Sequence, residues 1–448
     1  MLPAVRVKGA DPSRSTIWEI MDRYNVPGVS VAVINDGRLE WAKGYGVVAV
    51  GGAAVDTETL FLAGHISQGV AATAALKLVE RGLIGLDENV NTKMTSWSVP
   101  ENEFTPHQKV TLRRILSHTA GLNVPTSLGY LNGEPLPGIQ QVLEGEPPAQ
   151  NEPIRVVATP GEQVRYSLGG YVVLQQLLGD MTASPYADFV RATVLAPLGM
   201  ERSYHAQPLS GLLATNAAAG YQPTSEQVPG GSRVYPEQAA LGLWTTPSDL
   251  ARLVIALQRS YLDQSPNIIA RETAGQMFTP QLDDRGLGFI VGGADEWRSF
   301  SLEGHGNNYL CDLFAYVSQG MGAVVMTNSS NGEWVKSQVI RAIAAEYGWP
   351  DFRQSEIELA QLSEETAADL LGHYSFRSTE RILTREAGRL LFASEGGIAQ
   401  QLLPVSEDLF VEPVFGHHWG VERDATGSVS GITLISNGAR LFTYVRVD

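Results

Sequence analysis

The chain has 448 residues, which exceeds one domain of ordinary size, so two or three domains are expected. Apolar residues make up 44% and charged residues 18%, the composition of a globular protein without a bias toward disorder. The formal net charge of -16 argues against nucleic acid and against an anionic membrane surface as partners, because both require clustered Lys and Arg.

The cysteine content and the N-terminal sequence both bear on the cellular compartment of the protein. Cys311 is the single cysteine, so no intrachain disulfide forms and a reducing compartment is favoured. No apolar core or small-residue cleavage site is found in the N-terminal sequence MLPAVRVKGADPSRSTIWEI, so no signal peptide is predicted. No stretch reaches the roughly 18 consecutive apolar residues of a membrane span. We therefore expect a cytoplasmic protein without a membrane partner.

The first half of the chain begins with strands and continues with helices. Residues 26–45 predict two strands joined at Asp36-Gly37, because Asp-Gly between β-rich runs is a strong hairpin signal. Residues 68–83 change to a helical pattern whose apolar face is broad, so this helix is expected to be buried inside a domain. Residues 123–160 carry many Pro, Gly and Glu residues and predict a long irregular excursion.

Further elements complete the pattern. Helices are predicted over 171–178 and 186–195, and a third begins at an N-cap at Ser248. Residues 312–328 predict strand, glycine turn and strand, and 333–347 a closing helix. Strands, then many helices, then strands and one helix predict an α+β fold whose antiparallel sheet is flanked by helices.

The last part of the chain differs in composition. After Trp349-Pro350 we place a polar linker over 351–365, between a first domain at 1–350 and a second at 366–448. The second domain contains only short alternating segments separated by turn signals. It is therefore predicted to be a small antiparallel all-β domain, either a sandwich or a barrel.

Six motifs occur in an order that is typical of one known family. They are TETLF at 57–61 before a helix that ends in LVERG, ILSHTAGL at 115–122, PG and YS within 160–167, PLGM at 197–200, LWTTPSDL at 243–250, and GHG at 304–306 followed by TN at 327–328. Together they resemble the serine β-lactamase and penicillin-binding-protein superfamily, which includes class C β-lactamases, DD-peptidases and family VIII esterases. The resemblance implies a β-lactamase/transpeptidase-like domain with an all-helical subdomain, and the terminal β domain is similar to the lipocalin-like domain appended to some members.

The catalytic clusters of that family are altered in this sequence. The family's Ser-x-x-Lys pair supplies a nucleophile and the lysine that helps remove its proton. The flanking motifs place His65 at the serine and Gln68 at the lysine, whereas using Ser67 would put Val70 at the lysine and break the flanking match. The resemblance thus implies a divergent member that lacks the Ser-x-x-Lys pair and with it covalent serine catalysis.

The other two family clusters are retained in part. In the Tyr-x-Asn motif Tyr166 is kept and Leu168 replaces the asparagine. In the Lys/His-Thr/Ser-Gly motif His305 is kept and Asn307 replaces the glycine. The resemblance also implies the family's oxyanion hole, whose backbone donors would lie at His65 and at about Asn308; such a hole does not depend on side-chain identity and is worth roughly 3–4 kcal/mol per donor.

The residues that remain suit proton transfer. His65 is expected at a helix start, where free N–H groups and the helix dipole disfavour the imidazolium, and a neutral imidazole is a competent general base. If the fold is the family's, Tyr166 and His305 lie in the same cleft. These three residues are the candidate catalytic residues, and the candidate substrate-binding residues are Gln68, Leu168, Asn307 and Asn308.

Other chemically capable residues are interpreted as structural. His118 lies in a segment that is structural in the relatives, so a core or capping role is expected. Ser167 lacks a placed base for a role as substitute nucleophile. His417-His418 with Asp424 does not predict a metal site, because adjacent histidines in a β loop point to opposite faces. No metal and no cofactor are expected.

Three functions remain open. The first is an enzyme of the β-lactamase fold that performs non-covalent acid–base chemistry of the cyclase, lyase or isomerase type on a small carbonyl-containing substrate, in natural product biosynthesis. The second is a hydrolase, an esterase or amidase, that uses a histidine-activated water. The third is a catalytically inactive binding homologue. A small-molecule substrate is the expected partner, and the sequence does not determine the oligomeric state.

Overall fold

The computed structural model describes residues 1–10, 15–209, 211–436 and 438–448. It divides into two compact units, one comprising Val26–Gly332 and the other comprising Met1–Asn25 together with Glu333–Asp448. This division differs from the boundary at residue 350 that the sequence predicts. The reason lies in the N-terminal segment, whose strand β1 pairs in parallel with β12 and whose helix α1 packs on α11, both from the C-terminal third of the chain. These elements are β1 (Val5–Val7), α1 (Ile17–Arg23), α11 (Glu333–Glu346) and β12 (Ser355–Ile357).

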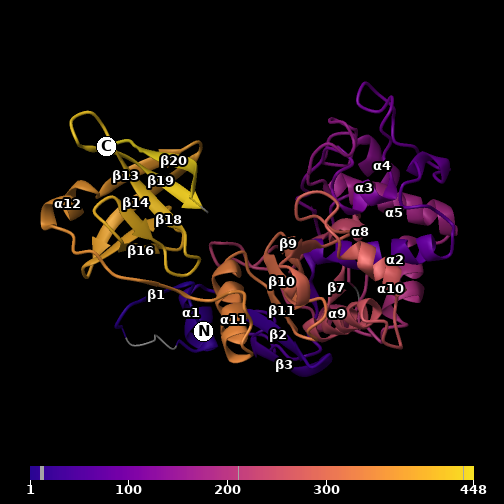
Figure 1. Cartoon of the computed structure of the whole chain (residues 1–448), viewed down its shortest axis with the longest axis horizontal. Coiled ribbons are helices and arrows are strands. Elements are labelled where there is room, and N and C mark those ends of the chain that lie inside the picture. Colours follow the sequence, from indigo (N-terminus) through magenta and orange to yellow (C-terminus); the bar gives the residue numbers. More distant parts are fainter. Residues whose placement is uncertain (11–14, 210, 437) are drawn as a thin grey trace. The chain divides into compact units, whose positions relative to one another are not determined.

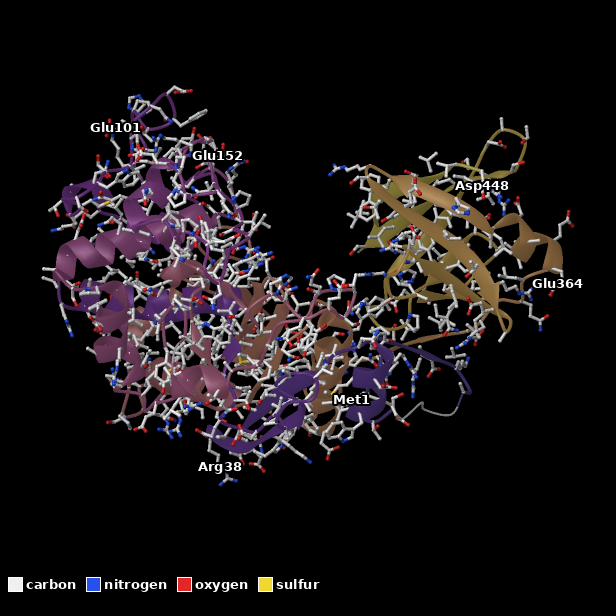
Figure 2. All side chains as sticks on the ribbon, turned by 180° about the vertical axis from the view of Figure 1, so that it is seen from behind. Met1, Arg38, Glu101, Glu152, Glu364 and Asp448 are labelled. Carbon is white, nitrogen blue, oxygen red and sulfur yellow. The ribbon has the colours of Figure 1, made fainter. Side chains whose placement is uncertain are left out.

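The larger unit contains a six-stranded antiparallel sheet in the order β3-β2-β11-β10-β9-β8 (Figure 1). The strands are β2 (Gly28–Asn35), β3 (Arg38–Gly46), β8 (Ile290–Gly292), β9 (Ser299–Gly306), β10 (Tyr309–Tyr316) and β11 (Gly322–Thr327). The predicted hairpin at Asp36-Gly37 is confirmed, and both residues have the positive φ that its turn requires. Arg38 follows this turn, and its side chain points away from the ribbon (Figure 2).

Helices accompany the sheet, so the predicted α+β class is confirmed. They are α2 (Ser67–Glu80), α3 (Leu112–Leu116), α4 (Ile139–Glu144), α5 (Leu168–Thr182), α6 (Tyr186–Val190), α7 (Leu212–Thr215), α8 (Gln238–Leu241), α9 (Pro247–Tyr261) and α10 (Arg271–Met277). Short turns and strands join them: β4 (Phe61–Leu62), η1 (Gly64–Ile66), η2 (Val90–Thr92), β5 (Tyr130–Leu131), η3 (Arg191–Leu195), β6 (Arg233–Val234), β7 (Trp244–Thr245) and η4 (Asp295–Trp297).

Helix α2 is buried along nearly its whole length, as its apolar pattern predicts, and it packs on α5 and α8. The N-cap predicted at Ser248 is wrong. Thr246 caps α9 instead, because its hydroxyl accepts the N–H of Asp249 at 3.2 Å and Pro247 occupies the first helical position, where no N–H donor is needed.

The smaller unit contains a closed eight-stranded antiparallel barrel, β13 to β20, so the all-β prediction is confirmed and the barrel alternative holds. Its strands are β13 (Gly372–Phe376), β14 (Thr379–Glu386), β15 (Arg389–Ala393), β16 (Gln400–Pro404), β17 (Leu409–Val411), β18 (His418–Arg423), β19 (Val429–Ser436) and β20 (Ala439–Arg446), preceded by α12 (Glu364–Asp369). Aromatic side chains fill it, among them Tyr374, Phe392, Trp419 and Tyr444.

In the part of the chain that the structure describes, no helix is long and apolar enough to cross a membrane. The cytoplasmic location stays a prediction.

Candidate functional site

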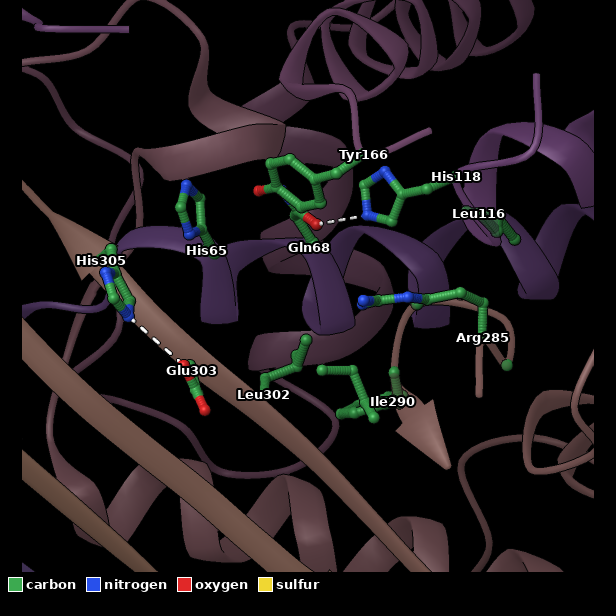
Figure 3. Close-up of a pocket in the computed structure, with 13 residues that line it drawn as sticks. His65, Gln68, Leu116, His118, Tyr166, Arg285, Ile290, Leu302, Glu303 and His305 are labelled. Carbon is green, nitrogen blue, oxygen red and sulfur yellow. Dashed lines mark hydrogen bonds and ion pairs between the residues drawn. The ribbon is translucent and has the colours of Figure 1, made fainter. Parts of the chain in front are cut away.

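A cavity of about 210 Å³ lies in the larger unit, where the start of α2 faces β9 and the loop before β8 (Figure 3). Its lining combines polar and apolar side chains: His65, Gln68, Leu116, His118, Tyr166, Arg285, Gly286, Gly288, Phe289, Ile290, Leu302, Glu303 and His305. The three predicted catalytic residues, His65, Tyr166 and His305, are all in this set. Gln68 is the one predicted substrate-binding residue that joins them.

Glycines allow the backbone to place His65 at the cavity. Gly64 opens the η1 turn with φ +54, and a Cβ there would lie 2.6 Å from the carbonyl carbon of His305. On the facing strand, a Cβ at Gly304 would lie 2.3 Å from the carbonyl oxygen of Ala63. Both contacts are too close for any side chain, so only glycine lets η1 approach β9 this closely. The side chains of His65 and His305 therefore meet across the gap.

The ring contacts among the candidate catalytic residues are short. The His65 ring centroid lies 5.5 Å from that of Tyr166, edge-on, and 5.9 Å from that of His305, stacked. Burial, with a smaller effect of the nearby His305, lowers the pKa of His65 to about 4. Its imidazole is therefore neutral near pH 7 and can accept a proton.

A chain of hydrogen bonds runs behind these rings and has a definite direction. The backbone N–H of Ser167 donates to Nδ1 of His118 at 3.3 Å, which leaves the imidazole proton on Nε2. That nitrogen lies 3.1 Å from Oε1 of Gln68 and donates to it. The amide nitrogen of Gln68 then donates to the hydroxyl oxygen of Tyr166 at 2.9 Å. Hydrogen positions follow from this network, since each group has a single consistent assignment.

The direction of this chain determines what Tyr166 can do. Its oxygen accepts from Gln68, so its own proton points elsewhere, and Figure 3 shows the hydroxyl directed toward His65. Burial raises the pKa of Tyr166 to about 12, so the hydroxyl stays protonated. Burial lowers the pKa of His118 to about 3, which keeps that imidazole neutral as well. The cavity thus presents a neutral base beside a free O–H donor.

His118 is a site residue whose role the sequence did not indicate. It is buried, its ring centroid lies 4.4 Å from that of Tyr166, and it orients Gln68 as described above. It follows α3 with φ +56, an uncommon conformation for a residue with a side chain. Its position inside the ILSHTAGL motif suggested only a core residue, because nothing in the sequence places that segment against Gln68.

Arg285 is the second residue that sequence reasoning missed. It reaches the cavity from the loop between α10 and β8, and its side chain is 25% exposed. Glycines again permit the approach: a Cβ at Gly288, where φ is +88, would lie 2.3 Å from Cβ of Ala72, and one at Gly69 would meet the Phe289 ring at 2.7 Å. The signal for this loop is its pair of glycines around Leu287, which does not by itself reveal a site.

The two serines weighed as nucleophiles are used elsewhere. Ser67 is fully buried; its hydroxyl donates to the carbonyl of Gly64 at 2.6 Å and accepts the N–H of Leu243 at 3.1 Å. Ser167 caps α5 by accepting the N–H of Gly170 at 3.0 Å. Neither lines the cavity.

Three expected substrate-binding residues lie outside the cavity lining. Leu168 is packed in the core at the start of α5. Asn307 and Asn308 form the two-residue turn between β9 and β10, where the amide of Asn307 donates to the carbonyl of Leu128 at 2.6 Å and that of Asn308 donates to the Ser330 hydroxyl at 3.1 Å. Both amides are therefore committed to neighbouring loops.

The expected oxyanion hole, with donors at His65 and at about Asn308, stays a prediction. The backbone N–H of His65 makes no hydrogen bond to another described residue. Asn308, near which the second donor was expected, does not line the cavity. The O–H of Tyr166 is another donor in the cavity lining. Over the residues that the structure describes, no group of three or more His, Cys, Asp or Glu side chains is placed to hold a metal ion.

Comparisons with known proteins agree with this architecture. The model of the family described as "Beta-lactamase" matches residues 14–347. Penicillin-binding protein 4* of Bacillus subtilis (strain 168) is 24% identical over 384 residues, which cover 79% of this chain and 80% of that protein. The unguisins hydrolase ungD' of Aspergillus campestris (strain IBT 28561) is 26% identical over 232 residues, 46% of this chain but only 40% of the hydrolase.

A solved structure is similar over nearly the full length. The octameric penicillin-binding protein homologue from Pyrococcus abyssi superposes with a TM-score of 0.65 and 22% identity, covering 94% of this chain and 95% of that one. At this identity the likeness shows the fold alone. The family match spans most of the chain and includes all the residues of the cavity. The chain therefore belongs to the Beta-lactamase family.

Proposed function

We propose that this chain is an enzyme of the β-lactamase fold that performs acid–base chemistry on a small carbonyl-containing substrate and forms no acyl-enzyme. The observation that carries the proposal is the directed chain His118–Gln68–Tyr166, which leaves the Tyr166 proton free beside the neutral imidazole of His65. Serine chemistry finds no support at this cavity, because the described lining contains no serine.

The proposed step is a proton transfer next to a carbonyl group. His65 removes a proton from the carbon beside the carbonyl, and the electron pair of that C–H bond moves toward the carbonyl oxygen. The O–H of Tyr166 donates a hydrogen bond to that oxygen and stabilises the enolate. The backbone N–H of His65 is the second donor. The histidine then returns the proton at another atom. Isomerisation, elimination and ring closure all follow from an enolate of this kind.

His118 and Gln68 act as positioning residues in this scheme. Gln68 holds the Tyr166 oxygen by donation and carries no charge, whereas a lysine at this place would favour the tyrosinate. His118 fixes the orientation of the Gln68 amide through Nε2. A hydroxyl that stays protonated is what a hydrogen-bond donor to an enolate requires.

Hydrolysis by a histidine-activated water is the second candidate. It is favoured by the pair of His305 and Glu303, whose Nε2 and Oε2 atoms lie 3.5 Å apart, since a carboxylate orients a basic imidazole. The similarity to a fungal hydrolase points the same way, although that match covers less than half of either chain. In this scheme His305 activates the water and Tyr166 polarises the carbonyl.

Solvent exchange separates these functions. The chain is incubated in D2O with a panel of small oxo acids and their methyl esters, and deuterium beside the carbonyl is followed by NMR. The proposal expects enzyme-dependent exchange that His65→Gln abolishes. Ester cleavage with 18O incorporation from water, without C–H exchange, would instead establish the hydrolase. Activity of neither kind would indicate an inactive homologue and would contradict both enzyme schemes.

A further inference from the structure

The cavity has a charged end that the proposed proton transfer does not use. Arg285 is the only Arg or Lys in the described lining. Figure 3 shows its side chain extending from the loop before β8 toward the part of the cavity that holds His118 and Gln68. The sequence resemblance implies a lysine at the position of Gln68, whereas the permanent positive charge of this lining is that of Arg285, which comes from a different element of the fold.

The charge of Arg285 is only partly balanced by the protein. Asp284 approaches Nε, with its Oδ1 atom 3.1 Å away, but its side chain is 53% exposed and lies in water more than in the cavity. The Nε group is buried and finds no hydrogen-bond acceptor in line with it. Among the described residues, no acceptor is hydrogen-bonded to the two terminal nitrogens of Arg285 either. These two terminal nitrogens are available to a ligand.

No other lining group supplies the missing negative charge at this end. His118 is neutral, and Gln68 and Tyr166 already bond to each other. Glu303 is paired with His305 at 3.5 Å. The remaining neighbours are apolar: Leu116, Phe289, Ile290 and Leu302. A guanidinium partly withdrawn from water beside apolar walls favours an anionic ligand, and its planar fork fits a carboxylate with two parallel hydrogen bonds.

The loop that carries Arg285 is held rigidly in place. The N–H of Gly288 donates to the carbonyl of Leu116 at 2.9 Å, and that of Gly286 donates to the carbonyl of Phe289 at 2.9 Å. The N–H of Gln281 donates to the carbonyl of Arg285 itself at 2.7 Å. The backbone that carries the guanidinium is therefore fixed. An anion bound to Arg285 has a defined position relative to His65 and Tyr166.

We propose that the substrate of this site is a small carboxylic acid whose carboxylate binds Arg285 while its carbonyl oxygen meets the hydroxyl of Tyr166. The volume of about 210 Å³ is below the roughly 300–1,000 Å³ of pockets for drug-sized ligands, which restricts the acid to a compact molecule. Leu116, Phe289 and Leu302 take its apolar carbons. The carbonyl half of this assignment rests on the proposed function, whereas the carboxylate half requires no catalysis.

Binding of benzoate and benzamide tests the carboxylate site directly, since the two have nearly the same shape and differ in charge. Both are titrated into the full chain by NMR with 13C-labelled histidine, so that shifts of the His65 and His118 signals place the ligand in the cavity. The expected result is binding of benzoate at least about tenfold tighter than benzamide, the effect of one charge-assisted pair. In Arg285→Gln this preference disappears while benzamide binding is unchanged, and Arg285→Lys keeps part of it.

Arg38→Gln is the matched control, because it removes the same charge from a hairpin side chain that is 69% exposed, and it leaves both affinities unchanged. Equal affinities for the two ligands, no binding of benzoate at millimolar concentration, or a preference that survives in Arg285→Gln would each overturn the assignment. If Arg285→Gln does not fold, the comparison of Arg285→Lys with the unmodified chain carries the test.

The outcome is separable from that of the proposed reaction. His65→Gln abolishes deuterium exchange and retains the preference for benzoate. If the unmodified chain prefers benzoate to benzamide but catalyses no deuterium exchange, the carboxylate site is supported and the proposed reaction is contradicted. If the chain catalyses deuterium exchange on neutral ketones at the same rate as on oxo acids, the proposed reaction is supported and the carboxylate site is contradicted.

Discussion

Nε2 of His118 lies 3.1 Å from Oε1 of Gln68, and this contact decides which proton of the site is available for catalysis. Because His118 accepts a backbone N–H at Nδ1, it can only donate to Gln68, and Gln68 can only donate to Tyr166. The order of donors along these residues ends with the Tyr166 hydroxyl facing His65.

Removal of the Tyr166 hydroxyl should lower kcat for exchange by about 10²- to 10³-fold, the usual effect of losing one donor to a developing oxyanion. The ring of Tyr166→Phe still packs on His118, so the fold is expected to be retained. Tyr204→Phe is the control, because that hydroxyl donates to the carbonyl of Glu201 outside the cavity, and it leaves kcat unchanged. Steady-state kinetics check this, and a Tyr166→Phe enzyme within twofold of the unmodified rate contradicts the role of the hydroxyl.

The positioning role of His118 predicts coupling to Gln68. Without the Nε2 donor the Gln68 amide can turn its oxygen toward Tyr166, so His118→Phe lowers kcat by roughly tenfold with little change in KM. Gln68→Met has a similar effect. If both act only by orienting Tyr166, the double variant loses no more than either single variant, whereas additive losses in a double-mutant cycle would show independent roles.

The acid limb of the pH–rate profile reports the base. Because burial and the neighbouring His305 lower the pKa of His65 to about 4, kcat/KM stays level as pH falls from 7 and declines only with a midpoint near 4. A free histidine would give a midpoint near 6.5. The measurement is kcat/KM between pH 3.5 and 8 with correction for unfolding, and a midpoint at or above 6.5 would show that His65 is not the buried base.

Buried neutral histidines also affect stability, and His205 tests this away from the cavity. Burial lowers the pKa of His205 to about 3, so below pH 6.5 the unfolded chain binds a proton that the folded chain refuses. The free energy of unfolding therefore falls relative to His205→Phe by about 1.4 kcal/mol per pH unit as pH falls from 6.5 toward 4. Urea unfolding at several pH values measures this difference, which cancels contributions from other groups. If the free energies of unfolding of the unmodified chain and of His205→Phe change with pH in parallel, His205 is not buried as a neutral ring.

Ser67 should matter for folding and not for chemistry. Ser67→Ala leaves the buried N–H of Leu243 without its acceptor, whereas the carbonyl of Gly64 keeps the backbone N–H of residue 67, so the loss is about 1–3 kcal/mol in the free energy of unfolding. The exchange rate should be unchanged, and a labelled penicillin should give no covalent adduct on the unmodified chain in intact-mass measurement. An adduct that disappears in Ser67→Ala would show that this serine is the nucleophile.

Much of the fold could be predicted from local pattern. The hairpin at Asp36-Gly37, the buried helix α2 and the all-β character of the last segment each follow from periodicity or turn chemistry over a few residues. The division into units could not, because the pairing of β1 with β12 joins residues about 350 positions apart. The cap of α9 was misplaced by two residues, since Thr246 and Ser248 are both good caps and only the geometry distinguishes them.

The residues of the site likewise fall into those that the sequence indicates and those that only the folded structure reveals. The resemblance brought His65, Tyr166, His305 and Gln68 together, and all four line the cavity. Other positions depend on contacts between loops. Asn307 and Asn308 are held by Leu128 and Ser330, and Arg285 enters because two glycines let its loop touch α2. Such contacts leave no periodic trace in the sequence, so a residue like Arg285 is found only in the folded chain.

15N NMR of the labelled imidazoles measures the protonation of His65 and His118, on which the proposed proton transfer through Gln68 and Tyr166 depends. We expect His65 to stay neutral from pH 7 to near 4 and His118 to carry its single proton on Nε2 over the same range. A His65 that titrates at pH 6.5 or above, or a His118 protonated at Nδ1, would contradict the proposed proton transfer.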